Sequence, residues 1–309
     1  MIRRSMRWPA LSYAEWSDTC ETLHMWTQIV GKIRMEKTPP MNHWWHVTLY
    51  VTARGLGTSL IPDECRPFEI DFDFLAHRLA IVTTEGERRE LPLEPMTVAD
   101  FYARVMNMLR ELNLDVQVNT LPSEVPNPIP FDHDREHRSY DLDAAQRFWR
   151  ALVCTTEVMT EFRSRFIGKV SPVHFFWGGF DLAATRFSGR RAPLHPPVPT
   201  VPDLVVQEAY SHECSSAGFW PGGMGFDAMY FAYGYPEPEG FSKARVRPSA
   251  ASYSDPLREF VLPYDAVRTA PQPEKALMEF LESTYDAAAD LGRWPRAELE
   301  RRGASHGIA

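Results

Sequence analysis

Cysteine is scarce in this 309-residue chain, and its spacing excludes two common ways of stabilising a small fold. The four cysteines, Cys20, Cys65, Cys154 and Cys214, lie far apart and form no Cys-x-x-Cys pair. We therefore expect neither a disulfide scaffold nor a zinc ribbon. A chain of this length can bury a full core without such cross-links, and a reducing cytoplasm is the simplest compartment for it.

Features of membrane and nucleic-acid-binding proteins are missing as well. No run approaches the roughly 20 apolar residues that cross a bilayer, and no apolar stretch of a signal peptide follows the charged N-terminus. The net charge of −8 repels phosphate backbones, and no basic cluster offsets it. We expect neither a membrane nor a nucleic acid as partner.

The familiar catalytic signatures are also absent. The chain contains no G-x-S-x-G, P-loop, H-E-x-x-H or dinucleotide fingerprint. The glycine-rich stretch at 222–225 follows Trp220-Pro221 and leads into no predicted helix, which is typical of a turn and not of a phosphate loop. The common enzyme classes lose support, and the motifs identify neither a reaction nor a substrate.

What the chain does contain is a succession of helix and strand patterns. Apolar residues at helical spacing predict helices at 11–35, 97–112, 141–166 and 273–291. Alternating patterns predict strands at 42–53, 68–74, 77–84, 88–93, 115–119, 171–189, 210–220, 228–235 and 258–263. The strand at 42–53 would place Trp44, His46 and Tyr50 on one face.

Several short segments recur in the same order, which indicates an internal duplication. Val30-Gly31-Lys32-Ile33 matches Ile167-Gly168-Lys169-Val170, and His43-Trp44-Trp45 matches His174-Phe175-Phe176-Trp177. Alternatively, two α+β halves resemble each other because helices and strands use similar residues.

We predict an α+β fold of two similar fused halves, with antiparallel sheet in the middle, helices packed outside and a pseudo-twofold axis. The halves are 1–121 and 141–292, joined by an ordered proline-rich linker at 122–140 and followed by a polar tail at 293–309. They would form one compact unit, with a ligand cleft favoured where they meet.

Several of these strings are long, rich in rare residues and specific to one family. They are Trp8-Pro9-Ala10-Leu11, Asn42-His43-Trp44-Trp45-His46-Val47, Phe68-Glu69-Ile70-Asp71-Phe72, Ser171-Pro172-Val173-His174-Phe175-Phe176-Trp177-Gly178, Arg186-Phe187-Ser188-Gly189 and Ser211-His212-Glu213. Over nearly its whole length the chain resembles an uncharacterised bacterial family, defined by a domain of unknown function. The resemblance implies a bacterial, cytoplasmic, single-domain protein and brings no activity, cofactor or catalytic residue.

Histidines in polar-aromatic strands are the candidates for catalysis. We expect His46, His212 and Glu213 to act as acid–base or ligand groups; the alternative is that they are hydrogen-bonded wall residues. Candidate substrate-binding residues are Trp44, Tyr50, Trp177, Arg54 and Arg186. The two arginines would orient an anionic group, or alternatively form salt bridges that fix a turn.

A divalent metal is a further possibility, with all other cofactors unknown. Two histidines and a carboxylate suit zinc or non-haem iron. The candidate ligands are His46, His174, His212 and Asp71. Asp71 also belongs to an acidic stripe with Glu69 and Asp73, which is typical of a solvated strand face.

Three functions fit this pattern. The first is a soluble enzyme acting on a small polar or anionic molecule in an aromatic, histidine-lined cleft between the halves. The second is a binding module that holds such a molecule without transforming it. The third is a structural or interaction protein whose aromatic residues form core or a homodimer interface.

Overall fold

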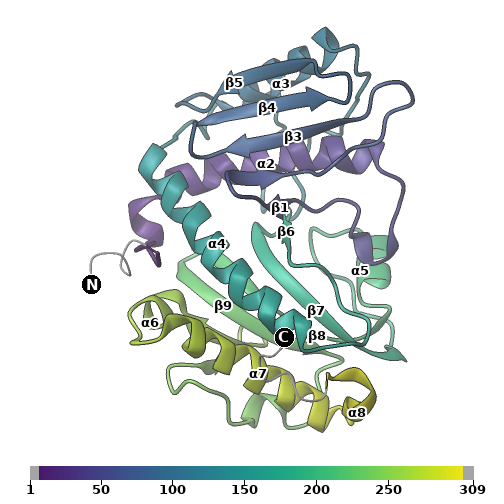
Figure 1. Cartoon of the computed structure of the whole chain (residues 1–309), viewed down its shortest axis with the longest axis vertical. Helices are drawn as coiled ribbons and strands as arrows, with labels where there is room; N and C mark the ends of the chain where they lie inside the picture. Colours follow the sequence, from purple (N-terminus) through teal and green to yellow (C-terminus); the bar gives the residue numbers. More distant parts are fainter. Residues whose placement is uncertain (1–6, 302–309) are drawn as a thin grey trace, which may run out of the picture.

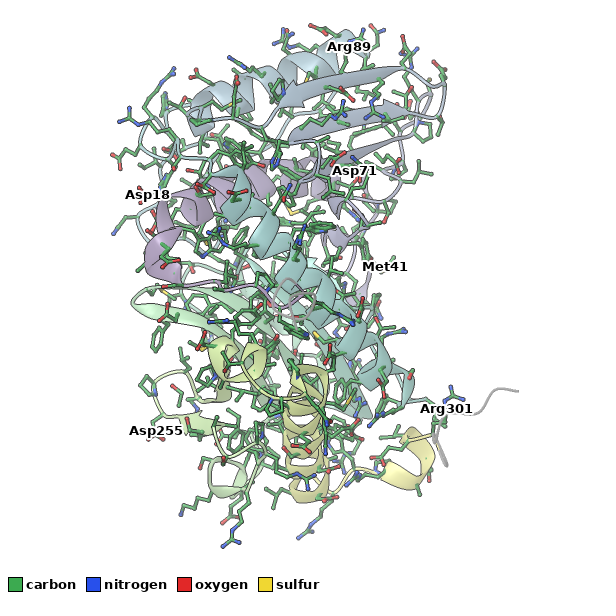
Figure 2. The ribbon with its side chains drawn as sticks, turned by 60° about the vertical axis from the view of Figure 1, so that its left-hand side comes forward. Asp18, Met41, Asp71, Arg89, Asp255 and Arg301 are labelled. Atoms are coloured by element: carbon green, nitrogen blue, oxygen red, sulfur yellow. The ribbon has the colours of Figure 1, made fainter. Side chains whose placement is uncertain are left out.

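The computed structural model describes residues 7–301 and contains two antiparallel sheets stacked along the long axis of the molecule (Figure 1). Arg89 of the N-terminal sheet lies at the top of the molecule, Met41 lies near mid-height and Asp255, near the C-terminal sheet, lies in the lower part (Figure 2). The predicted α+β class with two antiparallel parts is confirmed.

The N-terminal sheet has five strands that neighbour one another in chain order. They are β1 (Tyr50–Val51), β2 (Gly55–Gly57), β3 (Phe68–Asp73), β4 (Arg78–Thr83) and β5 (Arg88–Pro92), accompanied by helices α2 (Ser17–Lys37) and α3 (Val98–Glu111). Alternation in β3 buries Phe68, Ile70 and Phe72. Trp26 of α2 stacks on Phe101 of α3, with ring centroids 4.6 Å apart, so this core joins both helices to the sheet.

The C-terminal sheet has six strands in the order β10-β11-β9-β8-β7-β6. They are β6 (His174–Phe176), β7 (Asp181–Arg191), β8 (His212–Gly223), β9 (Phe226–Tyr235), β10 (Ser252–Ser254) and β11 (Glu259–Pro263). The helices of this part are α4 (Leu142–Ser164), α5 (Asp203–Ala209), α6 (Tyr264–Arg268), α7 (Pro273–Leu291) and α8 (Arg296–Leu299). Three 3-10 turns complete the described chain: η1 (Tyr13–Glu15) and η2 (Asn42–Trp44) before β1, and η3 (Phe241–Lys243) after β9. One face of the sheet packs on α4 and α7, as the hydrogen bond between the hydroxyls of Thr155 on α4 and Tyr230 on β9 illustrates. On the other face Phe231 and Tyr233 stay partly exposed.

Among residues 7–301, one pair of backbone hydrogen bonds joins the edges of the two sheets. Leu49 N–H donates to Phe175 O at 2.9 Å, and Phe175 N–H donates to Leu49 O at 2.8 Å, which forms an antiparallel bridge. Next to it, Trp177 Nε1–H donates to Val47 O at 2.7 Å. The indole lies so close to Gly31 of α2 that a Cβ there would overlap it. The edges of the two sheets are therefore held together by both backbone hydrogen bonds and side-chain packing.

Both parts run from a helix through antiparallel strands to a helix, and the two sheets meet next to their first strands, β1 and β6. This arrangement is compatible with two similar halves. The duplication, the pseudo-twofold axis and the boundaries at 121, 140 and 292 stay predictions.

Three predicted strands are wrong. The predicted strand at 171–189 is two strands, β6 and β7, separated by a turn at 177–180. Residues 42–53 contain only the short β1, because His43 and Trp44 have φ of 57° and 61° and so leave the extended region before the chain can pair. Residues 115–119 form no strand. The first helix also starts later than predicted, at Ser17, since 13–15 form a 3-10 turn and Ser12 makes no side-chain cap.

The proposed polar tail is packed as far as the structure describes it. Trp294 is buried, and Arg296 pairs with Asp286 at 2.6 Å and with Glu300. Residues 302–309 lie outside the described residues. No helix within 7–301 combines the length and apolar character needed to span a bilayer.

We expect Phe175→Ala to lower the free energy of unfolding by about 3–5 kcal/mol, because Phe175 is fully buried at the bridge between the sheets. The neighbouring Phe176 points to the other face of β6 and is partly exposed. Phe176→Ala is the matched control and should lose less than about half as much. Guanidinium denaturation would measure both, and equal losses would contradict the role of the bridge.

Candidate functional site

Five side chains gather where the two parts of the chain meet, and we call them the junction cluster. They are His43 of η2, Trp45 just after it, Lys169 before β6, Phe187 of β7 and His212 of β8. The His43 ring lies 4.6 Å from that of Phe187, 5.1 Å from that of Trp45 and 5.9 Å from that of His212, measured between centroids. Both parts of the chain therefore contribute to one small region.

The backbone is strained at this point. His43 and Trp44 are consecutive non-glycine residues in the left-handed region, which costs of order 1–3 kcal/mol each and is common at functional sites. The turn is held by a hydrogen bond of 3.0 Å between His43 Nδ1 and Ala209 O at the end of α5. It directs the His43 ring towards the C-terminal sheet and away from its own.

Lys169 is the cation of the cluster. Its Nζ lies 2.7 Å from His43 Nε2, and 5.6 Å and 5.2 Å from the ring centroids of Trp45 and Phe187. Within residues 7–301 no carboxylate forms an ion pair with it. The side chain remains open to solvent, but partial burial of the amine beside the two rings lowers the pKa of Lys169.

The neighbours of the two histidines define which nitrogen carries the hydrogen. Because the Ala209 carbonyl can only accept, His43 donates from Nδ1 and turns its Nε2 lone pair to Lys169. The Ser211 hydroxyl donates to Glu208 O at 2.8 Å, so His212 Nδ1, at 3.0 Å, donates to Ser211 Oγ. His212 Nε2 then holds a lone pair and, among the described residues, has no hydrogen-bond partner.

Both rings favour the neutral form. Burial and then the charge of Lys169 lower the pKa of His43, although its bond to Ala209 opposes this. Burial, Lys169 and Arg191 lower the pKa of His212. Arg191 is exposed, and on β7 it lies directly opposite His212 of β8 in the antiparallel register. The region therefore combines two cations with two neutral histidine acceptors.

A second, buried group adjoins the cluster. Arg34 of α2 donates to the carbonyls of His46, at 2.8 Å, and Thr58, and its guanidinium lies 5.3 Å from the Tyr50 ring. Tyr50 in turn contacts His174, with centroids 6.2 Å apart. Through these contacts Arg34 of α2, Tyr50 of β1 and His174 of β6 connect the two parts of the chain on the buried side of the junction.

His46 and His174 are buried and are used by the fold. His46 Nδ1 accepts from Met41 N–H at 3.1 Å, and its ring contacts that of Trp44 at 5.2 Å. His174 Nδ1 lies 3.1 Å from Thr48 Oγ1. Burial lowers the pKa of both, for His174 to about 3. No hydrogen bond or ring contact within 7–301 joins His46 to His212.

The remaining predicted site residues lie elsewhere. Glu213 faces away from His212 and binds Ser188 Oγ at 2.8 Å and Arg190 at 2.7 Å. Trp177 is buried against Gly31. Arg54 is exposed and pairs with Asp73 at 2.7 Å, which is the turn-fixing alternative.

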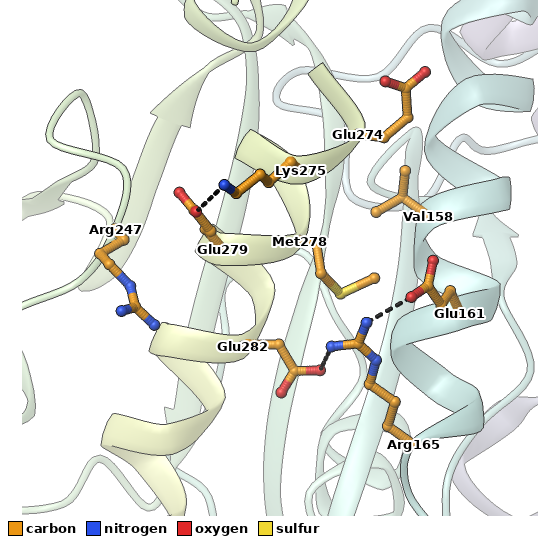
Figure 3. Close-up of a pocket in the computed structure, with 9 residues that line it drawn as sticks. All are labelled: Val158, Glu161, Arg165, Arg247, Glu274, Lys275, Met278, Glu279 and Glu282. Carbon is orange, nitrogen blue, oxygen red and sulfur yellow. Dashed lines mark hydrogen bonds and ion pairs between the residues drawn. The ribbon is translucent and has the colours of Figure 1, made fainter. Parts of the chain in front are cut away.

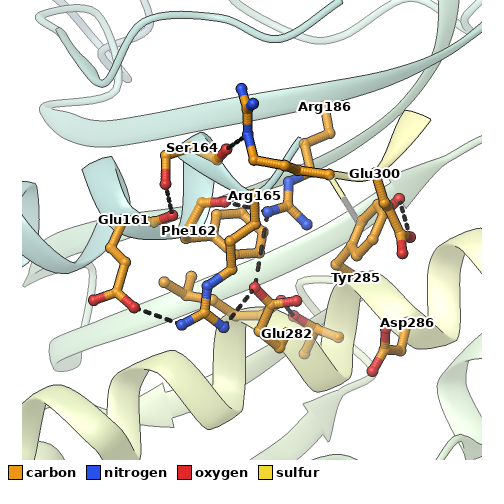
Figure 4. A network of polar contacts seen from close by, with 12 residues as sticks. Glu161, Phe162, Ser164, Arg165, Arg186, Glu282, Tyr285, Asp286 and Glu300 are labelled. Carbon is orange, nitrogen blue, oxygen red and sulfur yellow. Dashed lines mark hydrogen bonds and ion pairs between the residues drawn. The ribbon is translucent and has the colours of Figure 1, made fainter. Parts of the chain in front are cut away.

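Arg186 is buried on the helix-covered face of β7, where it lies beside Phe162 and Tyr285 (Figure 4). Its guanidinium lies 3.4 Å from the ring centroid of Phe162 and 4.3 Å from that of Tyr285, and it donates to Phe162 O. The Oε1 atom of Glu282 lies 3.8 Å from Nη2 of Arg186. Burial lowers the pKa of Arg186 to about 10. In this position it supports the core and does not meet the junction cluster.

The four candidate metal ligands do not converge. Asp71 lies on β3 of the other sheet, where burial, and then Glu69, raise its pKa to about 6. Across residues 7–301, no group of three histidine, cysteine, aspartate or glutamate side chains is placed to hold one metal ion.

A hollow of about 480 Å³ lies between α4 and α7 (Figure 3). Most of its charges already pair: Arg165 contacts Glu161 at 2.5 Å and Glu282 at 3.4 Å, and Lys275 lies 3.9 Å from Glu279. It therefore offers less to a small anion than the junction cluster does.

The sequence patterns predicted only His212 among the five residues of the cluster and missed Trp45, Phe187, His43 and Lys169. The polar residues among those missed are His43 and Lys169. Both lie inside the repeated segments, His43 before Trp44-Trp45 and Lys169 after Gly168. That repetition was the available signal. Their proximity depends on the turn at His43 and on the bridge between the sheets.

The fold and cluster define an α+β protein of two joined antiparallel sheets with a basic, histidine-rich junction. The chain belongs to the family of unknown function DUF5996, whose model matches residues 8–301, and this confirms the family resemblance. No curated protein and no solved structure matches the chain.

Protonation of His174 should make stability depend on pH. Its pKa is about 3 in the folded chain against an ordinary 6.5, so between these values the unfolded chain binds more protons. This difference in proton binding contributes about 3–5 kcal/mol to the free energy of unfolding. The contribution is fully present above pH 6.5 and is lost as the pH falls towards 3. In His174→Asn, which keeps a donor near Thr48, urea midpoints should fall less between pH 7 and pH 4.

The exposed His133 provides the control, since its side chain is 75% accessible. His133→Asn should keep the wild-type dependence on pH. Parallel slopes for wild type and His174→Asn would contradict a buried, neutral His174.

Proposed function

We propose that the protein is an enzyme that acts on a small anionic molecule bound at the junction cluster. The observation that carries this proposal is that Lys169 and Arg191 flank His212 while neither forms an ion pair within the described residues. A carboxylate or phosphate group would supply the missing negative charge. In a chain of net charge −8, such a local concentration of unpaired cations favours anions at that place.

The neighbouring groups suit acid–base chemistry on the bound molecule. His212 Nε2 carries a free lone pair next to both cations, and its tautomer is fixed by Ser211. Such a group can remove a proton from a ligand held by Lys169 and Arg191. Trp45 and Phe187 provide apolar rings beside the amine, against which the carbon skeleton of the ligand would lie.

The alternative is a binding module without catalysis. It is favoured by one observation: His46 and His174, two of the predicted chemical groups, are buried and occupied in hydrogen bonds. Only His212 is then left as a proton acceptor open to a ligand. Binding without turnover would support this alternative.

The cytoplasm remains the proposed compartment. All four cysteines are free thiols, and Cys20, Cys154 and Cys214 are buried, which is compatible with a reducing environment. A homodimer, a bacterial source and the absence of nucleic-acid and membrane partners also stay proposals.

Anion binding is tested with inorganic phosphate and malonate, followed by isothermal titration and by Trp fluorescence. We expect wild-type protein to bind at least one of them, and Lys169→Gln or Arg191→Gln to weaken binding about tenfold, the effect of losing one charge-assisted bond. Lys243→Gln is the matched control, because Lys243 is exposed and far along the chain at η3. Equal affinity for the anion in the wild type and all three variants would contradict an anion site at Lys169 and Arg191.

Catalysis is tested with a mixture of small carboxylates and phosphate esters, whose consumption is followed by mass spectrometry. His212→Gln should bind as wild type does but turn over the consumed compound about 100-fold more slowly, as expected when a general base is lost. Turnover unchanged in this variant would contradict the assigned base. No turnover by wild type, with anion binding intact, would favour the binding module.

A further inference from the structure

We infer that Lys169 is a nucleophile that forms an imine with the carbonyl carbon of the bound anion. The substrate class is then a small carbonyl compound with an anionic group, such as a 2-oxo acid, whose carboxylate Arg191 holds. This inference rests on the proposed anion site and assigns its two cations different tasks.

The choice of lysine at this position is the first argument. The chain has only five lysines, Lys32, Lys37, Lys169, Lys243 and Lys275, among 33 lysines and arginines together. Arginine thus serves nearly everywhere that this protein needs a positive charge. A guanidinium would hold an anion at 169 at least as well, but only an amine can lose its proton and attack carbon.

The surroundings of the amine are the second argument. The rings of Trp45 and Phe187 replace water on part of its surface, and this loss of water disfavours the ammonium form and outweighs the attraction of the ring faces for a cation. The 2.7 Å hydrogen bond to His43 Nε2 uses one N–H and leaves the lone pair of the neutral amine for attack. His43 itself is held by Ala209, so this geometry is fixed by the strained turn.

The other lysines lack this combination. Lys37 pairs with Asp63 at 2.6 Å and Lys275 with Glu279 at 3.9 Å, so a carboxylate stabilises each ammonium. Lys32 is buried in α2. Lys243 is exposed but has no histidine or aromatic contact in the described part of the chain. Lys169 alone is open to solvent, free of a carboxylate and hydrogen-bonded to an imidazole.

The step balances without an oxidant or a reductant. The Nζ lone pair forms a bond to the carbonyl carbon while the C=O π pair moves to oxygen, which takes a proton from solvent. His43 Nε2, 2.7 Å from Nζ, accepts a proton from the attached nitrogen and returns it to the hydroxyl, which leaves as water. The product is an iminium ion, whose positive charge can then stabilise electron density released from the neighbouring carbon.

The test uses the full chain with glyoxylate or pyruvate and sodium cyanoborohydride, which reduces an imine to a stable secondary amine. Peptide mass spectrometry then compares the modified fraction of Lys169 with that of Lys243, the equally exposed control in the same molecule. We expect Lys169 to be modified at least about tenfold faster, and inorganic phosphate to slow its modification by competition at Arg191.

Phosphate binding by the same wild-type protein separates this inference from the proposed function, because it reports on the anion site whether or not an imine forms. Equal modification of Lys169 and Lys243, with phosphate binding intact, would overturn the imine and leave the anion site. Loss of phosphate binding in wild type would instead overturn the proposed site on which both depend.

Discussion

The antiparallel bridge between Leu49 and Phe175 is the contact on which the rest of this structure depends. It joins the edges of two sheets whose buried residues form one continuous hydrophobic core, and the Trp177 indole fills the space beside it that Gly31 leaves open. Such a pair of hydrogen bonds is weak alone. It is effective because Phe175 and Leu49 are both fully buried, so the sheets cannot separate without exposing apolar surface.

The bridge also brings unlike segments together. The chain on one side of it carries His43 and Trp45, and the chain on the other side carries Lys169 and Phe187. Each side alone would present a turn with one polar group on an aromatic surface. Together they enclose an amine and two imidazoles in a region where water is partly replaced by rings, and this changes the proton affinity of all three groups in the same direction.

The protein accommodates its cations in three different ways. Arg186 lies within an aromatic cage with Glu282 nearby, and Arg34 donates to carbonyls near Tyr50. A buried cation needs such partners, because leaving water is expensive for a charge. Lys169 has rings and an imidazole but no acidic partner. This difference separates a structural cation from one that is available for a ligand, and it is invisible in the sequence, where all three are basic residues near aromatic ones.

Local patterns determined much of the fold. The alternation in 68–74, the hairpin at 77–93 and the periodic helices near 98–111, 142–164 and 273–291 predicted real elements, because each pattern reports which face of one element is buried. Tertiary structure decided the site. His43 and Trp44 left the extended region because the turn is held by Ala209, some 166 residues away in the chain, and Arg186 was drawn into the core by Phe162 and Tyr285. The sequence by itself determined the elements and the family. Which histidine meets which lysine depended on contacts between distant segments, and no local pattern records those.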